Sequence, residues 1–249
     1  MRAVSVVVFA AGAFACASAC GGFSAADGDP TDAGGAETSS IDVAESDAAP
    51  ADADAAACVA PTCDSTQSCK SWHFDSGCED WTFGGDLDIT THECAAGRLH
   101  VAADNTADIE ATVSVVNPTV PYELRVAARI SIAKWDKDRV LRIASNGKIV
   151  GQLVVASLGG DAGVKMGFCS DNGVCASGTF DWKPNEEHLV IIDSAVGGTK
   201  WSIDCVALGS IPAVTLAAGM NAKTTLTFGK TDGQPLDGTI DDVTVTFKF

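Results

Sequence analysis

The chain has 249 residues, of which 46% are hydrophobic, and its formal net charge is −17 at pH 7. This acidic balance disfavours binding to DNA or RNA, because nucleic-acid phosphates repel an acidic surface. Nine acidic residues and no Lys or Arg lie in residues 21–57, and without them and Arg2 the charge of residues 58–249 is −9. A divalent cation or a neutral ligand suits such a domain better.

Residues 1–19 have the three parts of an export signal. Arg2 supplies the charged start, an apolar run rich in alanine follows, and Ala17-Ser18-Ala19 forms a cleavage site. The run is too short and too rich in alanine to predict a membrane span. Together with Cys20, the last three residues also resemble a lipobox, in which the cysteine is acylated, although Ala17 replaces the usual leucine.

Cysteine counting favours acylation of Cys20 over simple secretion, which is the alternative. If Cys16 leaves with the signal and Cys20 carries lipid, the remaining cysteines form an even set. These cysteines are predicted to form disulfides rather than a zinc site, because an exported protein meets an oxidising compartment. They are Cys58, Cys63, Cys69, Cys78, Cys94, Cys169, Cys175 and Cys205. The prediction is an outer-membrane or cell-surface lipoprotein that contacts the membrane through its lipid alone.

Three segments follow the signal. Residues 20–57 are poor in aromatic and branched side chains, so they are predicted to be an acidic, disordered tether. Residues 58–70 form a cysteine-rich collar. Residues 71–249 are long enough for one two-sheet core and are predicted to be a single folded domain.

Short runs of alternating apolar and polar residues recur through this domain, and none sustains a helical pattern. Asn146-Gly147 is the strongest hairpin signal, and Cys169 to Cys175 is expected to form a second hairpin. Cys78 and Cys94 are proposed to tie a first hairpin. Strands are expected at residues 71–75, 80–83, 87–91, 97–101, 107–116, 122–133, 139–145, 149–157, 164–169, 213–218, 224–229 and 239–248. Many short strands predict a sandwich or barrel.

Residues 179–210 are predicted to form the central hairpin, with a glycine turn at residues 196–199. Its apolar residues fall at period two, which places one set on the buried face. The members of this set are Leu189, Ile191, Trp201, Ile203 and Cys205. Four tryptophans in strand patterns are assigned to the core: Trp72, Trp81, Trp182 and Trp201.

Three motifs in this order point to a known fold. The first is Trp72-His-Phe-Asp75 followed by Trp81. The second joins Trp182, His188, Asp193, Gly197-Gly198 and Trp201-Ser-Ile-Asp204, and the third is Leu236-Asp-Gly-Thr-Ile-Asp-Asp-Val-Thr-Val-Thr-Phe247. Together they resemble the concanavalin A-like jelly rolls and, among these, the laminin G-like modules. The resemblance implies an all-β, two-sheet antiparallel jelly-roll sandwich over residues 71–249.

One departure from the family's pattern lies at Cys205, which stands where the family usually has glycine after aspartate. It implies a turn that is held covalently. The tether, lipobox and collar also look like those of bacterial surface lipoproteins.

The domain has no signature of catalysis. Jelly-roll hydrolases resemble one another in a Glu-x-Asp-x-Glu or Glu-x-Asp-x-x-Glu strand, which places two carboxylates on one face. The domain's glutamates lack this spacing: Glu79, Glu93, Glu110, Glu123, Glu186 and Glu187. Related lyases use a basic cleft lined by Tyr and His, whereas Tyr122 is the only tyrosine here. No G-x-S-x-G or H-E-x-x-H motif occurs, so the sequence predicts that the protein is not an enzyme.

Two candidate sites remain. Asp241 is expected to share a strand face with Val243 and Val245, where a carboxylate needs backbone N–H partners or a cation. With Asp75 it resembles the structural calcium site of jelly-roll modules, and turn capping by both carboxylates is the favoured alternative. Trp135, in a polar run, is predicted to stack on a sugar face, with packing against the sheet edge as its alternative.

These observations predict a non-catalytic surface module for binding or adhesion, with carbohydrate as the ligand class. The expected partners are an extracellular glycan or a surface protein, and calcium is the one cofactor considered. The alternatives are a jelly-roll hydrolase or lyase with an unrecognised site, and a structural component of the envelope.

Overall fold

The computed structural model describes residues 59–249 except 64–67, 105, 136–138, 158–163, 171–173, 217 and 231–234. The predicted signal peptide, Cys20, the tether and Cys58 lie outside the described residues. The residues described form fifteen strands and no helix. Accordingly, no helix long and apolar enough to cross a membrane occurs in this part of the chain.

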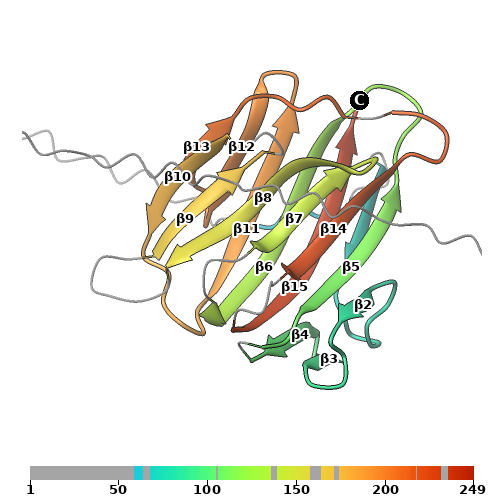
Figure 1. Ribbon diagram of the computed structural model, residues 1–249. Coiled ribbons are helices and arrows are strands. Elements are labelled where there is room, and N and C mark those ends of the chain that lie inside the picture. Colours follow the sequence, from blue (N-terminus) through green and yellow to red (C-terminus); the bar gives the residue numbers. More distant parts are fainter. Residues whose placement is uncertain are drawn as a thin grey trace, which may run out of the picture. The chain divides into compact units, whose positions relative to one another are not determined.

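Two antiparallel sheets pack face to face (Figure 1). Sheet A has the order β13-β12-β11-β6-β15-β4-β3, and β1 also pairs with β15. Its strands are β1 (Ser68–Trp72), β3 (Thr91–Ala95), β4 (Arg98–Ala103), β6 (Glu123–Trp135), β11 (Glu187–Ala195), β12 (Gly198–Ile203), β13 (Val206–Ile211) and β15 (Leu236–Lys248). The predicted all-β, two-sheet antiparallel sandwich is confirmed.

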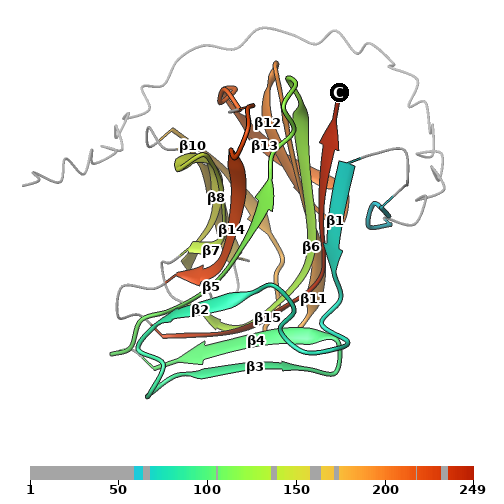
Figure 2. The same cartoon turned by 90° about the vertical axis from the view of Figure 1, so that its right-hand side faces the viewer.

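Sheet B has the order β10-β9-β8-β7-β14-β5-β2. Its strands are β2 (Thr82–Gly85), β5 (Ile109–Val116), β7 (Arg139–Ser145), β8 (Lys148–Ser157), β9 (Val164–Cys169), β10 (Cys175–Phe180) and β14 (Lys223–Lys230). Figure 2 shows the two sheets nearly edge on, with sheet B bent so that its outer face lies on the inside of the curve. A concave outer face is thus available on sheet B.

The core lies between the inner faces of the two sheets. Its largest buried side chains include Trp72, Trp201, Phe168 and Phe228, and Trp81 and Trp182 are also buried. The assignment of the four strand-pattern tryptophans to the core is therefore confirmed. Aromatic and branched side chains at alternate strand positions provide most of the apolar surface that this sandwich buries.

Strand β15 is the centre of sheet A. It pairs with β6 on one side, and on the other side with β4 through residues 236–240 and with β1 through residues 243–247. The register against β6 shifts between Asp241 and Thr244, and Asp242 has a positive φ of 46°. This is a β-bulge, which bends a strand and changes which side chains face the core.

Most predicted strands occur within a few residues of their expected ends, and the Asn146-Gly147 hairpin between β7 and β8 is confirmed. Two predicted strands are wrong. Residues 213–218 form no strand where they are described, and the chain instead pairs as β13 before them. The strand expected at residues 87–91 begins only at Thr91, because residues 86–90 are tied into a local turn by Leu87 N–H to the Gly85 carbonyl and Ile89 N–H to the Asp86 carbonyl.

The central hairpin has a different register from the predicted one. Val190 and Ile192 face the core opposite Ile203 and Trp201, so the predicted inward set with Leu189 and Ile191 is wrong by one residue. Residues 189–192 are all apolar, which leaves period two without a unique face. The prediction that Cys205 continues the buried strand face is also wrong, because it lies in the exposed turn between β12 and β13.

Disulfides hold several turns. Cys63–Cys69, Cys78–Cys94 and Cys169–Cys175 are bonded, and Cys205 is also in a disulfide. The Cys78–Cys94 bond does not tie a hairpin, because β1 pairs with β15 and β2 with β5. Such bonds form in oxidising compartments, so they indicate an exported protein.

Candidate functional site

The concave outer face of sheet B displays one continuous polar row. Alternation along the strands places these side chains outward, opposite the core positions. Cross-strand pairing then aligns the row over five neighbouring strands, because each member lies opposite the next. In order across the sheet, the row is Thr82, Thr112, Thr227, Arg142 and Gln152.

The centre of this row holds two polar groups without a partner. Arg142 and Gln152 are direct cross-strand neighbours, yet Arg142 Nε and Gln152 Oε1 are shielded from water and make no hydrogen bond to any described residue. An unmet buried polar group costs about 1–3 kcal/mol. Among the neighbouring outward positions, Ala144 and Val154 carry no charge, whereas Arg139 opposite Val154 is basic. A ligand polar group that reached the pair would remove this cost.

Hydroxyl groups continue the row away from Arg142. Thr112 Oγ1 lies 3.3 Å from Thr227 Oγ1, and Ser114 Oγ lies 3.1 Å from Thr225 Oγ1 in the adjacent row. A hydroxyl both donates and accepts hydrogen bonds, as the hydroxyls of a sugar also do. The face therefore presents hydroxyl groups on neighbouring strands, and an extended sugar chain could form hydrogen bonds with them along its length.

Few acidic side chains belong to the strands of this face. The seven strands of sheet B contain a single acidic residue, Glu110 on β5. Hydrolysis of a glycosidic bond ordinarily uses two carboxyl groups on opposite sides of the bond. The described strands of sheet B carry one such group.

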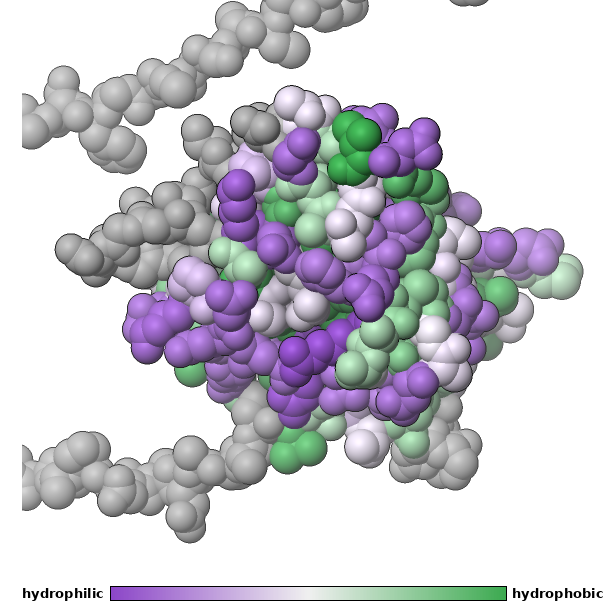
Figure 3. Space-filling view, turned by 90° about the horizontal axis from the view of Figure 1, so that it is seen from below, coloured by the Kyte–Doolittle hydropathy of each residue, from purple (hydrophilic) through white to green (hydrophobic). Residues whose placement is uncertain are grey.

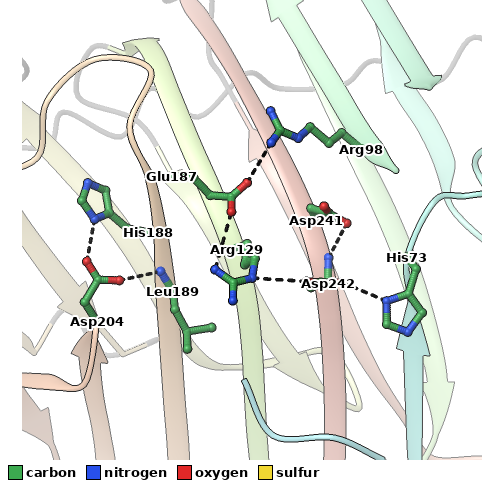
Figure 4. A network of polar contacts seen from close by, with 9 residues as sticks. All are labelled: His73, Arg98, Arg129, Glu187, His188, Leu189, Asp204, Asp241 and Asp242. Atoms are coloured by element: carbon green, nitrogen blue, oxygen red, sulfur yellow. Dashed lines mark hydrogen bonds and ion pairs between the residues drawn. The ribbon is translucent and has the colours of Figure 1, made fainter. Parts of the chain in front are cut away.

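The outer face of sheet A carries a network of charged residues (Figure 4). Arg129 on β6 donates to Asp242 at 3.2 Å, and its guanidinium also lies 3.5 Å from Glu187 on β11. Glu187 accepts from Arg98, and Asp242 lies 2.9 Å from the His73 ring, a contact that raises the pKa of His73. These side chains are partly exposed, and such pairs each contribute about 0–1 kcal/mol. The network cross-links four strands of the sheet.

A pocket of about 490 Å³ lies where residues 59–63 cross this face. His73, Arg129 and Asp242 form its polar wall. Each of these residues is already paired within the network, so the pocket has no unmet group comparable to that on sheet B.

The bulge in β15 corrects the prediction for Asp241. It does not share a face with Val243 and Val245; Ile240 faces the core and Asp241 points outward, opposite Arg129 in the register. Its carboxylate accepts from the Asp242 N–H at 2.6 Å, while burial and then the nearby Asp242 and Glu187 raise its pKa.

Asp75, the other predicted calcium ligand, is exposed in the β1–β2 loop. Within the described part of the chain, no group of three or more His, Cys, Asp or Glu residues could hold a metal ion. The hydrogen bond from the Asp242 N–H therefore supplies a partner for the Asp241 carboxylate.

Trp135 is the last residue of β6 rather than part of a polar loop, and it is 2% exposed. Its ring packs 5.8 Å from that of Phe228, and Gly229 and Gly238 lie against it. A Cβ at Gly238 would be 2.8 Å from the ring, so glycine is required for this close approach. The prediction that Trp135 stacks on a sugar is wrong, because no face of the ring reaches the surface.

The central motif forms a structural cluster. His188 Nδ1 lies 2.7 Å from Asp204 Oδ2, and the Leu189 N–H donates to Asp204 Oδ1 at 2.8 Å. The ring of Trp182 lies 4.5 Å from that of His188. Trp182, His188 and Asp204 thus meet and fix the β12–β13 turn against β11, which is a role in the fold. Figure 4 shows the two contacts of Asp204, with His188 and with Leu189.

Sequence reasoning missed Arg142 and Gln152. Both lie in strands that were predicted, and their polar character at outward positions was visible. Their proximity required the pairing of β7 with β8 and its register shift, which the sequence pattern does not specify.

No family model matches the chain, and no curated protein matches it. Solved structures match its fold. The cellulose-induced protein Cip1 has 11% identity and a TM-score of 0.52, with 71% of this chain and 96% of that chain covered. The carbohydrate recognition domain of Emp47p has 9% identity and a TM-score of 0.52, with 75% and 99% covered.

Peanut lectin has 10% identity and a TM-score of 0.51, with 72% of this chain and 97% of that chain covered. The chain spans 18% of a sialidase chain at 13% identity and a TM-score of 0.48. At these identities the likenesses establish the concanavalin A-like fold.

Proposed function

We propose that the sandwich is a non-catalytic carbohydrate-binding module whose site is the concave outer face of sheet B. The observation that carries this proposal is the adjacent pair Arg142 and Gln152, whose Nε and Oε1 atoms have no hydrogen-bond partner among the described residues. These two atoms are shielded in the structure, so the side chains must rotate before polysaccharide hydroxyls can bond to them. The threonine row extends the same chemistry along the sheet.

The structural neighbours support the same ligand class. Peanut lectin and the carbohydrate recognition domain of Emp47p share this fold, and their names describe carbohydrate binding. The presence of one carboxylate on the strands of sheet B favours binding without hydrolysis. Two alternatives remain. One is a polysaccharide-active enzyme with an unrecognised site, and the other is a structural envelope protein without a glycan ligand.

A glycan array with the purified protein tests the proposal, followed by titration calorimetry on the best polysaccharide. We expect Arg142→Ala and Gln152→Ala each to weaken binding by tenfold or more, since each hydrogen bond to a charged or amide group is worth about 1–3 kcal/mol. Arg98→Ala, on sheet A, is the matched control and should bind as the wild type does.

If glycan binding survives both Arg142→Ala and Gln152→Ala, the ligand binds at a site other than the outer face of sheet B. Release of shortened sugars from the bound polysaccharide would instead favour the enzyme, and absence of any array signal would favour the structural protein.

We also propose that the protein is exported and anchored at the cell surface through acylated Cys20. Disulfides at Cys78–Cys94 and Cys169–Cys175 support passage through an oxidising compartment. Growth with a clickable fatty acid should label the wild type but not a Cys20→Ser variant. A wild type that stays unlabelled while it appears in the medium would show simple secretion.

A further inference from the structure

Five segments meet at the end of the sandwich that carries the C-terminus (Figure 1), and we call this the loop end. Backbone hydrogen bonds join neighbouring loops there: Asn117 N–H to the Ala222 carbonyl at 2.7 Å, and Asn146 N–H to the Lys223 carbonyl at 2.8 Å. The loop end is therefore one connected surface. It consists of residues 116–123, 145–148, 195–200, 211–216, 218–223 and 248–249.

Apolar side chains protrude from separate segments of the loop end. Val196 in the β11–β12 turn is 94% exposed, Met220 in the β13–β14 loop 88%, and Phe249 beyond β15 73%. Val116 and Val120 are exposed as well. A soluble surface normally scatters such residues singly, so their gathering at one end indicates an interaction surface.

The charge of the loop end is opposite to that of the whole chain. Its segments contain four lysines and one acidic residue, Glu123, whereas the chain has 16 basic and 33 acidic residues. Asp193, near this end on β11, is held by Arg125 in a two-point ion pair. The four lysines are Lys148, Lys200, Lys223 and Lys248.

The distribution of charge decides which surface can approach. Exposed charges farther away than about 8–10 Å are largely screened at physiological salt, so a surface that approaches the loop end meets mainly its lysines. At the opposite end of the sandwich, hydrophilic residues predominate (Figure 3). Among the described residues, the three large apolar side chains that are most exposed, Val196, Met220 and Phe249, all lie at the loop end.

We propose that the loop end docks on a lipid surface that contains anionic headgroups. Val196, Met220 and Phe249 enter the interface between headgroups and acyl chains, and the surrounding lysines contact lipid phosphates. A second copy of the chain is disfavoured as the occupant, because two such ends would bring like-charged lysines together. This docking is independent of glycan binding, since the face of sheet B runs along the side of the sandwich.

Vesicle sedimentation of the full chain with Cys20→Ser, which removes acylation at that position, tests the proposal. We expect binding to vesicles of phosphatidylcholine and phosphatidylglycerol in equal amounts, weak binding to phosphatidylcholine alone, and release by high salt. A lysine near an anionic membrane contributes about a fivefold change in affinity. Lys148→Gln, Lys200→Gln and Lys223→Gln together should weaken binding about a hundredfold.

A second variant set, Val196→Ser with Met220→Ser and Phe249→Ser, should also abolish sedimentation, and these exposed positions leave the core intact. Matched controls away from the loop end are Lys134→Gln with Lys183→Gln, and Val206→Ser, which should bind as the parent does. Equal losses in controls and loop-end variants would overturn the proposal. So would a failure of the parent to bind mixed vesicles, or a dimer in solution that the Val196, Met220 and Phe249 substitutions dissociate.

Discussion

His188 Nδ1 lies 2.7 Å from Asp204 Oδ2, because the pairing of β11 with β12 brings the start of one strand beside the end of the other. His188 is only 8% exposed, so its ring needs a partner inside the protein. Asp204 provides that partner and also accepts from the Leu189 N–H. One carboxylate thus closes the turn that leads from β12 to β13.

Removal of this carboxylate should destabilise the domain. Asp204→Ala leaves His188 Nδ1 and the Leu189 N–H without their acceptor, and we expect a loss of about 1–3 kcal/mol in the free energy of unfolding. Asp204→Asn should lose less, because its amide oxygen can still accept and Asn tolerates the positive φ of 48°. Urea unfolding measures the difference. Asp80→Ala is the control at an exposed ion pair, and an equal loss there would contradict this explanation.

The contact between Gly238 and Trp135 gives a second prediction. In Gly238→Ala the new Cβ would lie 2.8 Å from the indole ring and 3.0 Å from the Ser131 carbonyl oxygen. We expect a loss of about 1–3 kcal/mol, as overpacked cores show. Thermal unfolding should detect it. Gly197→Ala, where nothing lies within 4 Å of the added Cβ, should not lower the midpoint. A fall there would show that alanine strains the backbone at glycine positions even without a contact.

The disulfides should differ in their contributions according to the loops they close. Cys78–Cys94 spans 16 residues and Cys169–Cys175 spans 6. Loop-closure entropy predicts losses of about 3 and about 2 kcal/mol when each pair is replaced by serine. Chemical unfolding of the two double variants measures the order. The reverse order would show that packing around the bonds outweighs chain entropy.

The raised pKa of Asp241 predicts a pH dependence. A carboxyl whose pKa is higher in the folded than in the unfolded state favours folding below its ordinary pKa of 3.8, and this contribution disappears as pH rises through the folded value. At neutral pH the buried charge is therefore unfavourable. Asp241→Asn, which can still accept from the Asp242 N–H, should raise the unfolding temperature at pH 7 but not near pH 3.

Asp242→Asn is the matched control for this prediction. Asp242 accepts from Arg129 and is bonded to His73, so loss of its charge should lower the unfolding temperature at neutral pH. A rise in both variants would show that net negative charge, rather than the position of Asp241, limits stability.

The sequence predicted the fold class well, because strand alternation and turn residues act locally. The Asn146-Gly147 turn and the hairpin from Cys169 to Cys175 are of this kind. Registers were harder. Residues 189–192 are apolar at every position, and the bulge at Asp242 depends on how β15 meets β6 and β4.

The candidate site could not be predicted from its parts. Arg142 and Gln152 are ordinary polar residues in two strands until pairing places them side by side. Trp135 illustrates the converse, because polar neighbours in the sequence suggested exposure while Gly229 and Gly238 make room for its ring in the core. In both cases the position of the side chain depends on contacts between strands, which the local sequence does not show.

The position of β1 beside β15 has a consequence for how the protein is made. Ser68 pairs with Phe247, so the earliest described strand meets its partner only when nearly the whole chain has been synthesised. Pairings between such distant residues form slowly, and the open strand edges can meanwhile associate with other chains. Sheet A can therefore complete its pairing only after β15 has been made.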